Sequence, residues 1–122
     1  MKAKDKRIAE LTLKIPQVTP EEAYRRCRQG AYIVDVRDAH EVYQGSPVSA
    51  VRISRAFLEL LIEDHIADQA QPLLILCAGG LRALFAADNL QQLGYQDVHF
   101  ITGGFDRWKK ERIPFEVPTK PT

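Results

Sequence analysis

Short apolar runs with strand character alternate with segments of helical spacing along most of this 122-residue chain. Strands are predicted at residues 32–36, 51–53, 73–76 and 98–101. Helical segments separate these runs, and such alternation is typical of β/α units whose parallel sheet is covered by helices on both faces. The pattern therefore predicts an α/β fold.

Capping residues and glycines predict where the helices begin and end. Thr19-Pro20-Glu21-Glu22 is a capping box that opens a helix to about residue 29, where Gly30 stops it. Asp38 and Glu41 mark a short helix, and another is expected around Trp108. Ser54 is expected to cap a helix whose apolar side is formed by Phe57, Leu58, Leu61, Ile62 and Ile66.

The two ends of the chain are expected to differ from the central domain, which we predict at residues 18–117. Residues 1–17 form an extension, either a helix with Ile8, Leu11 and Ile15 on one stripe or a mobile arm. Residues 118–122 are predicted to be a flexible tail.

Charge and cysteine content exclude several classes of function. The 17 basic and 16 acidic residues nearly cancel, so neither nucleic acid nor a membrane is an expected partner. Cys27 and Cys77 are too few for a disulfide scaffold or a zinc site, and no metal or cofactor is expected. No apolar signal segment follows the basic start, so a cytoplasmic location is expected.

The segment Cys77-Ala78-Gly79-Gly80-Leu81-Arg82 lies between the predicted strand 73–76 and the helix that ends at Gly94. Unpaired backbone amides and the positive end of the helix dipole meet at such a turn, and both stabilise a thiolate. The two glycines permit positive φ angles, so the amides of residues 78–82 can surround an anion or an outer sulfur atom on Cys77. A buried structural thiol is the alternative interpretation.

Arg82 has three candidate roles: stabilising the Cys77 thiolate, anchoring an anionic donor, or holding the loop in place. The loop also limits the size of its ligand. Four residues separate Cys77 from Arg82, whereas the phosphate-binding loop of tyrosine phosphatases encloses five, so a smaller group is expected.

These motifs resemble those of the rhodanese family of single-domain sulfurtransferases over about residues 18–117. The segment Ile33-Val34-Asp35-Val36-Arg37-Asp38 is similar to the family's first-strand signature, and Gly103-Gly104-Phe105-Asp106-Arg107-Trp108 to its C-terminal one. The resemblance implies a mainly parallel sheet of about five strands, a sulfur-carrying Cys77, and a substrate loop of Ala78, Gly79, Gly80, Leu81 and Arg82. It also implies that Asp35 and Arg37 brace this loop. Family members commonly have Gly-His-Ile-Pro-Gly-Ala where this chain has Gly45-Ser46-Pro47-Val48-Ser49-Ala50.

The predicted activity is transfer of sulfur from thiosulfate or a persulfide donor to a thiophilic acceptor through a Cys77 persulfide. Residues 55–60, together with Cys77-Ala78-Gly79-Gly80, also resemble rhodanese modules joined to adenylating enzymes. A sulfur-carrier protein or its adenylating enzyme is therefore a candidate partner. Two alternatives remain: a binding or regulatory module without turnover, and a small phosphatase or arsenate reductase.

Overall fold

Five parallel strands form the central sheet of the computed structural model, which describes residues 1–120. Their order across the sheet is β1-β6-β5-β2-β4, so the strand that leads to Cys77 is in the middle. The strands are β1 (Gln17–Val18), β2 (Tyr32–Asp35), β4 (Val51–Arg52), β5 (Leu73–Leu76) and β6 (Val98–Ile101). The predicted α/β fold with a parallel sheet of about five strands is confirmed.

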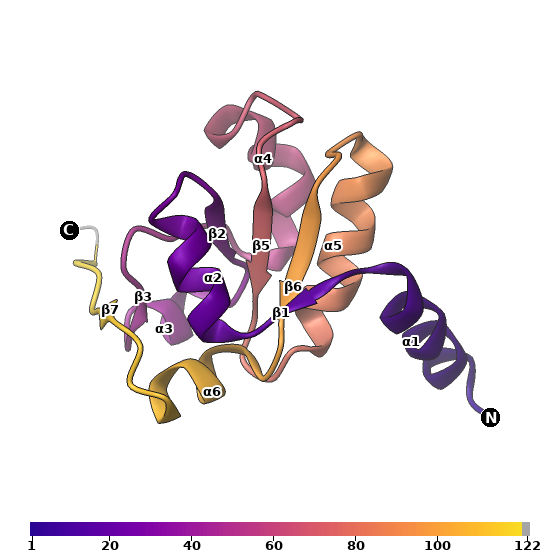
Figure 1. Cartoon of the computed structure of the whole chain (residues 1–122), viewed down its shortest axis with the longest axis horizontal. Coiled ribbons are helices and arrows are strands. Elements are labelled where there is room, and N and C mark those ends of the chain that lie inside the picture. Colours follow the sequence, from indigo (N-terminus) through magenta and orange to yellow (C-terminus); the bar gives the residue numbers. More distant parts are fainter. Residues whose placement is uncertain (121–122) are drawn as a thin grey trace.

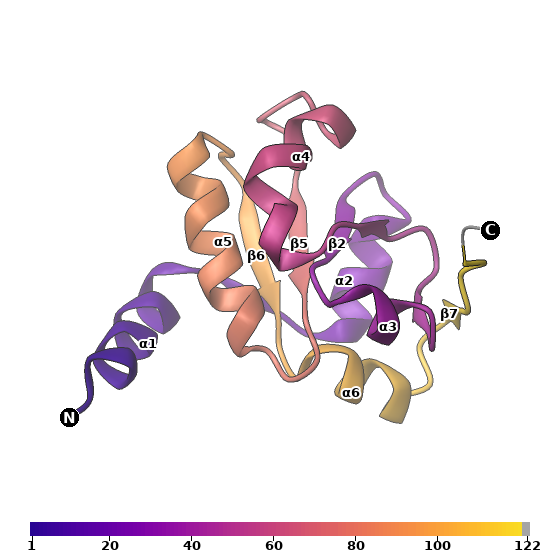
Figure 2. The same ribbon diagram turned by 180° about the vertical axis from the view of Figure 1, so that it is seen from behind.

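Helices cover both faces of this sheet, as Figures 1 and 2 show from opposite sides. One face carries α1 (Ala3–Lys14), α4 (Leu58–His65) and α5 (Leu81–Leu93), and the other carries α2 (Pro20–Cys27) and α6 (Gly104–Lys110). Side chains alternate along β5 because successive residues of a strand point to opposite faces. Leu73, Ile75 and Cys77 join the core under α4 and α5, whereas Leu74 and Leu76 join the core under α2 and α6.

The predicted end of α5 is present, but only half of the capping box predicted for α2 is formed, because the Glu22 carboxylate pairs with Arg25 and Arg26 and not with the Thr19 N–H. The backbone N–H of Glu22 donates to Thr19 Oγ1 at 3.1 Å, and α5 ends at Gly94 with a left-handed φ of 115°. The short helix after β2 is α3 (Ala39–Val42), where the Glu41 carboxylate accepts the N–H of Asp38 at 3.2 Å. Helix α2 ends two residues before the expected position.

The prediction for the helix after Ser54 was partly wrong. The segment begins with a 3₁₀ turn, η1 (Arg55–Phe57), before α4, and the Ser54 side chain makes no capping hydrogen bond. Leu58 and Ile62 are buried as expected, but Phe57 and Leu61 are 56% and 40% exposed. The tighter 3₁₀ turn changes the rotation of the chain before the α-helix starts, which moves Phe57 away from the buried face.

The segments outside the central sheet pack at its margins. Of the two alternatives for the N-terminal segment, the structure contains the helix: α1 lies against α5 and buries Leu11 and Ile15. Near the other end, β7 (Phe115–Glu116) pairs antiparallel with β3 (Ser46–Pro47). Residues 118–120 of the predicted tail have no helix or strand, and residues 121–122 lie outside the described part. Within residues 1–120, no helix is long and apolar enough to cross a membrane.

Candidate active site

Cys77 directly follows β5, in the loop that leads from the carboxyl end of this strand into α5. Figure 2 shows the two elements that the loop joins. Its side chain is 1% exposed. The sulfur atom accepts two backbone hydrogen bonds, from the N–H of Gly80 at 3.0 Å and from the N–H of Ala83 at 3.2 Å. Gly80 has a φ of 111°, a conformation that glycine adopts without steric penalty, and it lets the chain turn back over the sulfur atom.

The Cys77 sulfur therefore occupies the place of a helix-capping side chain. Gly80 stands at the N-cap of α5 but has no side chain, and Ala83 is the third helical residue, whose N–H a capping atom normally accepts. The sequence predicted a contribution from the amides of residues 78–82, and the structure adds Ala83. The sequence signal for Ala83 was its position in the first turn of the helix, where backbone N–H groups have no partner within the helix. Gly79, in contrast to Gly80, does not use a positive φ.

Helix α6 holds the other side of the cysteine loop. The N–H of Phe105 donates to the Cys77 carbonyl at 2.7 Å, and the N–H of Asp106 donates to the Ala78 carbonyl at 3.1 Å. A trans peptide directs its C=O and its N–H in opposite directions, so the amides of Ala78 and Gly79 point away from α6. Within residues 1–120, the amides of Ala78, Gly79, Leu81 and Arg82 donate to no protein atom.

Gly104 allows α6 to approach the cysteine loop closely. A Cβ atom at this position would lie 2.3 Å from the Cys77 carbonyl oxygen and 2.4 Å from that of Ala78, and φ is 57°. Sequence reasoning did not assign this role to Gly104, because the contact joins segments separated by 27 residues. The glycine pair before Phe105 was the available signal.

Arg82 forms a two-hydrogen-bond ion pair with Glu41 of α3. Its Nη1 donates to Oε1 at 3.1 Å and its Nη2 to Oε2 at 3.0 Å. The hydrogen bond to Glu41 is the main reason that the pKa of Arg82 is raised, and the same bond lowers the pKa of Glu41. Among the three roles considered for Arg82, this contact fits that of holding the loop in place, since it joins α5 to α3.

Asp35 and Arg37 form a buried ion pair at the end of β2. Arg37 Nε and Nη2 donate to the two Asp35 oxygens at 3.0 and 2.8 Å, and Nη2 also donates to the Gly45 carbonyl at 2.6 Å. The Ser46 hydroxyl donates to Asp35 at 2.8 Å. These bonds brace the segment at Gly45 and Ser46, where the chain differs from the common family pattern, and none of them reaches the cysteine loop.

The link from this ion pair to the cysteine loop is through Phe105. The Arg37 guanidinium carbon lies 4.1 Å from the centre of the Phe105 ring, a cation–π contact, and the Phe105 N–H holds the Cys77 carbonyl. A hollow of about 180 Å³ lies beside the loop. It is lined by Arg37, Glu41, Gln44, Ala78, Phe105, Asp106 and Lys109.

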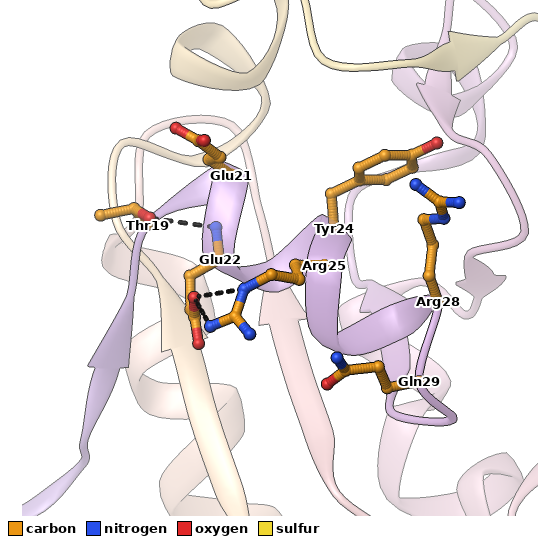
Figure 3. Close-up of a pocket in the computed structure, with 7 residues that line it drawn as sticks. All are labelled: Thr19, Glu21, Glu22, Tyr24, Arg25, Arg28 and Gln29. Carbon is orange, nitrogen blue, oxygen red and sulfur yellow. Dashed lines mark hydrogen bonds and ion pairs between the residues drawn. The ribbon is translucent and has the colours of Figure 1, made fainter.

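A larger hollow of about 690 Å³ lies along α2 (Figure 3). Helix α2 covers the face of the sheet opposite to α5. The side chains around the hollow belong to residues 19–29 and include the ion pair of Glu22 and Arg25. None of the predicted site residues lines it. Cys27 of α2 is a free, half-buried thiol, and burial raises its pKa. Residues 1–120 contain no group of three or more His, Cys, Asp or Glu side chains that could hold a metal ion.

The fold and the loop define an α/β domain that presents a cysteine sulfur to backbone amides at the start of a helix. Residues 19–111 match the family model for the rhodanese-like domain, and the chain belongs to that family. A thiosulfate sulfurtransferase GlpE of Haemophilus influenzae is 30% identical over 102 residues, which cover 83% of this chain and 94% of the relative.

Two solved structures have closely similar folds. A Rhodopseudomonas palustris protein of unknown function, named as a possible tyrosine phosphatase, is 27% identical with a TM-score of 0.85; the match covers 95% of this chain and 96% of the other. The polysulfide-sulfur transferase of Wolinella succinogenes is 25% identical with a TM-score of 0.79, over 90% and 84% of the two chains.

Proposed function

We propose that this chain is a sulfurtransferase that carries sulfane sulfur on Cys77. The observation that supports this most strongly is the position of the Cys77 sulfur, 3.0 Å from the amide of Gly80 and 3.2 Å from that of Ala83. These amides and the start of a 13-residue helix direct hydrogen-bond donors and the positive end of the helix dipole at this sulfur atom. Sulfurtransferase relatives that match most of the chain are consistent with the proposal.

Both steps of the proposed reaction are displacements at sulfur. The Cys77 thiolate attacks the outer sulfur of thiosulfate or of a persulfide, a new S–S bond forms, and sulfite or a thiolate leaves with the electron pair of the broken bond. The free amides of Ala78, Gly79, Leu81 and Arg82 are then available to the outer sulfur. A second nucleophile attacks that sulfur and regenerates the Cys77 thiolate.

The acceptor comes from outside the loop, because residues 78–82 contain no second nucleophile. In this proposal it is a thiol or a sulfur-carrier protein. Cyanide serves as a convenient test acceptor. The resemblance of residues 55–60 to modules joined to adenylating enzymes supports a carrier protein that acts in trans.

Mass spectrometry of the intact protein tests the proposal directly. The chain is incubated with thiosulfate, and separately with a persulfide, and the same is done with Cys77→Ser and Cys27→Ser. We expect the mass of one sulfur atom to appear on the wild type and on Cys27→Ser but not on Cys77→Ser. The proposal fails if a folded wild-type chain gains no sulfur from either donor, or if Cys77→Ser gains it equally.

Phosphate-ester hydrolysis is a second candidate, favoured by the name of the Rhodopseudomonas palustris neighbour. The four residues between Cys77 and Arg82 argue against it, since tyrosine phosphatases use five to surround a phosphate. Both terminal nitrogens of Arg82 already donate to Glu41, so the guanidinium is not free to bind a phosphate. Release of phosphate from p-nitrophenyl phosphate by the wild type, but not by Cys77→Ser, would favour this candidate over sulfur transfer.

A further inference from the structure

Arg82 is the cationic residue within the loop of residues 77–82, and both ends of its guanidinium are engaged. Nη1 and Nη2 each donate to a different oxygen of Glu41, at 3.1 and 3.0 Å. This paired geometry is the strongest that arginine makes with a carboxylate. An anionic substrate near Cys77 therefore meets an arginine whose charge is already compensated.

Glu41 is held in this position from its own helix. Its Oε1 also accepts the backbone N–H of Asp38 at 3.2 Å, which is part of the capping box of α3. The hydrogen bond from Arg82 lowers the pKa of Glu41, so the carboxylate is ionised at neutral pH. Moving Glu41 away from Arg82 would break the cap and the ion pair together.

The other charges beside the loop are balanced as well. Arg37 is paired with Asp35, and the hollow next to Ala78 is lined by Lys109 and Asp106 in addition to Glu41. With Arg82, the charged side chains that line this hollow or contact its lining comprise three cations and three carboxylates. A dianion entering the site thus gains no net attraction from them.

The loop also exposes an apolar side chain beside the paired Arg82. Leu81, between the two amides that hold the sulfur atom, is 59% exposed. An apolar side chain at this position suits the carbon skeleton of an organic thiol and gives nothing to a small inorganic oxyanion.

We propose that Glu41 is a specificity-determining residue which, by neutralising Arg82, directs Cys77 toward organic persulfides and away from the thiosulfate dianion. This inference rests on the proposed sulfur transfer and names its donor class. The Cys77 thiolate attacks the outer sulfur of R–S–SH, Cys77–S–SH forms, and R–S⁻ leaves, so atoms and charge balance. Thiosulfate reacts by the same step, but it is a dianion whose charge the paired Arg82 does not offset.

The test is a comparison of kcat/KM for thiosulfate, a dianion, and for the persulfide of 2-mercaptoethanol, which carries at most one negative charge. Glu41→Gln keeps an oxygen that can accept the Asp38 N–H and removes the charge that compensates Arg82. We expect the ratio of thiosulfate to persulfide use to rise about tenfold, mainly through a lower KM for thiosulfate. In the wild type, the persulfide is expected to be the better donor by about tenfold or more.

Glu22→Gln is the matched control. It removes the same charge from a carboxylate paired with arginines, but on α2, across the sheet from α5. We expect it to change the ratio by less than about twofold. The double variant Glu41→Gln/Arg82→Gln removes both charges of the pair, and its ratio is expected to return to within about threefold of the wild-type value.

Three outcomes would overturn the inference: an unchanged ratio in a folded Glu41→Gln protein, an equal shift in Glu22→Gln, or wild-type preference for thiosulfate. A ratio that stays raised in the double variant would assign the effect to altered geometry and would also overturn it. Absence of sulfur on Cys77 with either donor is a different result, because it contradicts the proposed function itself.

Discussion

At the scale of single residues, the Cys77 sulfur has a structural task in addition to the proposed chemical one. It is the acceptor for the amides of Gly80 and Ala83, and no other protein atom within residues 1–120 accepts from them. A buried amide without an acceptor destabilises the folded state. The nucleophile position and the start of α5 are therefore coupled through one atom.

This coupling predicts different stabilities for two variants of Cys77. The hydroxyl introduced by Cys77→Ser still accepts amide hydrogen bonds, as serine does at helix N-caps, whereas Cys77→Ala leaves both amides unpaired. We expect Cys77→Ala to have a free energy of unfolding lower than that of Cys77→Ser by about 1–2 kcal/mol. Urea unfolding monitored by the fluorescence of Trp108 measures this difference. Equal stabilities would show that the sulfur atom does not act as a cap.

Gly104 offers a second prediction at this scale. In Gly104→Ala the new Cβ would lie 2.3 Å from the Cys77 carbonyl oxygen, so α6 must move away from the loop or the chain must strain. We expect the free energy of unfolding to fall by about 2–4 kcal/mol and sulfur loading of Cys77 to slow.

Gly30→Ala is the control for Gly104→Ala, since Gly30 also has a positive φ but its Cβ would meet nothing within 4 Å. It should lose only about 1 kcal/mol, from backbone strain. Similar losses in both variants would contradict the proposed role of close packing at Gly104.

At the scale of elements, α1 is attached to α5 by a charged cluster around Asp88. Arg7 and Lys14 of α1 contact the two oxygens of this nearly buried carboxylate at 2.8 and 2.5 Å. Burial of Asp88 opposes ionisation, but the hydrogen bond and charge of Lys14, together with Arg7, outweigh it and lower the pKa. Leu11 and Ile15 bury the apolar side of the same contact.

Asp88→Asn is expected to weaken this attachment and to lower the free energy of unfolding by about 1–2 kcal/mol at neutral pH. A carboxylate with a lowered folded-state pKa contributes stability above its unfolded pKa of about 3.9 and loses it as the pH falls through the folded value. The difference in unfolding free energy between wild type and variant should therefore be constant at neutral pH and shrink below about pH 4.

Asp64→Asn, an exposed position on α4, is the control for the Asp88 experiment. It should leave stability unchanged at every pH. Limited proteolysis gives a second readout, because release of α1 from α5 exposes its chain to cleavage. An Asp88→Asn protein with wild-type stability and protease resistance would contradict the attachment.

Elements and contacts differed in how far the sequence could predict them. β5, α5 and its end at Gly94 follow from local patterns: an apolar run, helical spacing and a glycine stop. The exposure of Phe57 was predicted wrongly because it depends on a 3₁₀ turn that apolar spacing does not distinguish from an α-helical one. The Arg82 and Glu41 pair joins residues 41 positions apart, and only the tertiary fold brings them together.

At the scale of the whole molecule, charge balance is the property that the sequence and the site share. The chain has a formal net charge of +1, and the two arginines beside the loop, Arg37 and Arg82, are each paired with a carboxylate. Long-range steering of an anion therefore has no source in the wild-type protein. We therefore expect substrate recognition to depend on contacts within the loop and not on a long-range field.

This balance predicts a weak effect of salt on the wild-type reaction with thiosulfate. Raising the salt from about 50 mM to about 300 mM should change kcat/KM by less than about twofold, since no net attraction is screened. In Glu41→Gln the uncompensated Arg82 attracts the dianion, so the same salt increase should lower kcat/KM by about threefold or more. The persulfide of 2-mercaptoethanol carries at most one negative charge and is the control, so in Glu41→Gln its salt effect should be weaker than that of thiosulfate. A strong salt dependence in the wild type would mean that a cation at the loop still acts on anions despite its carboxylate partner.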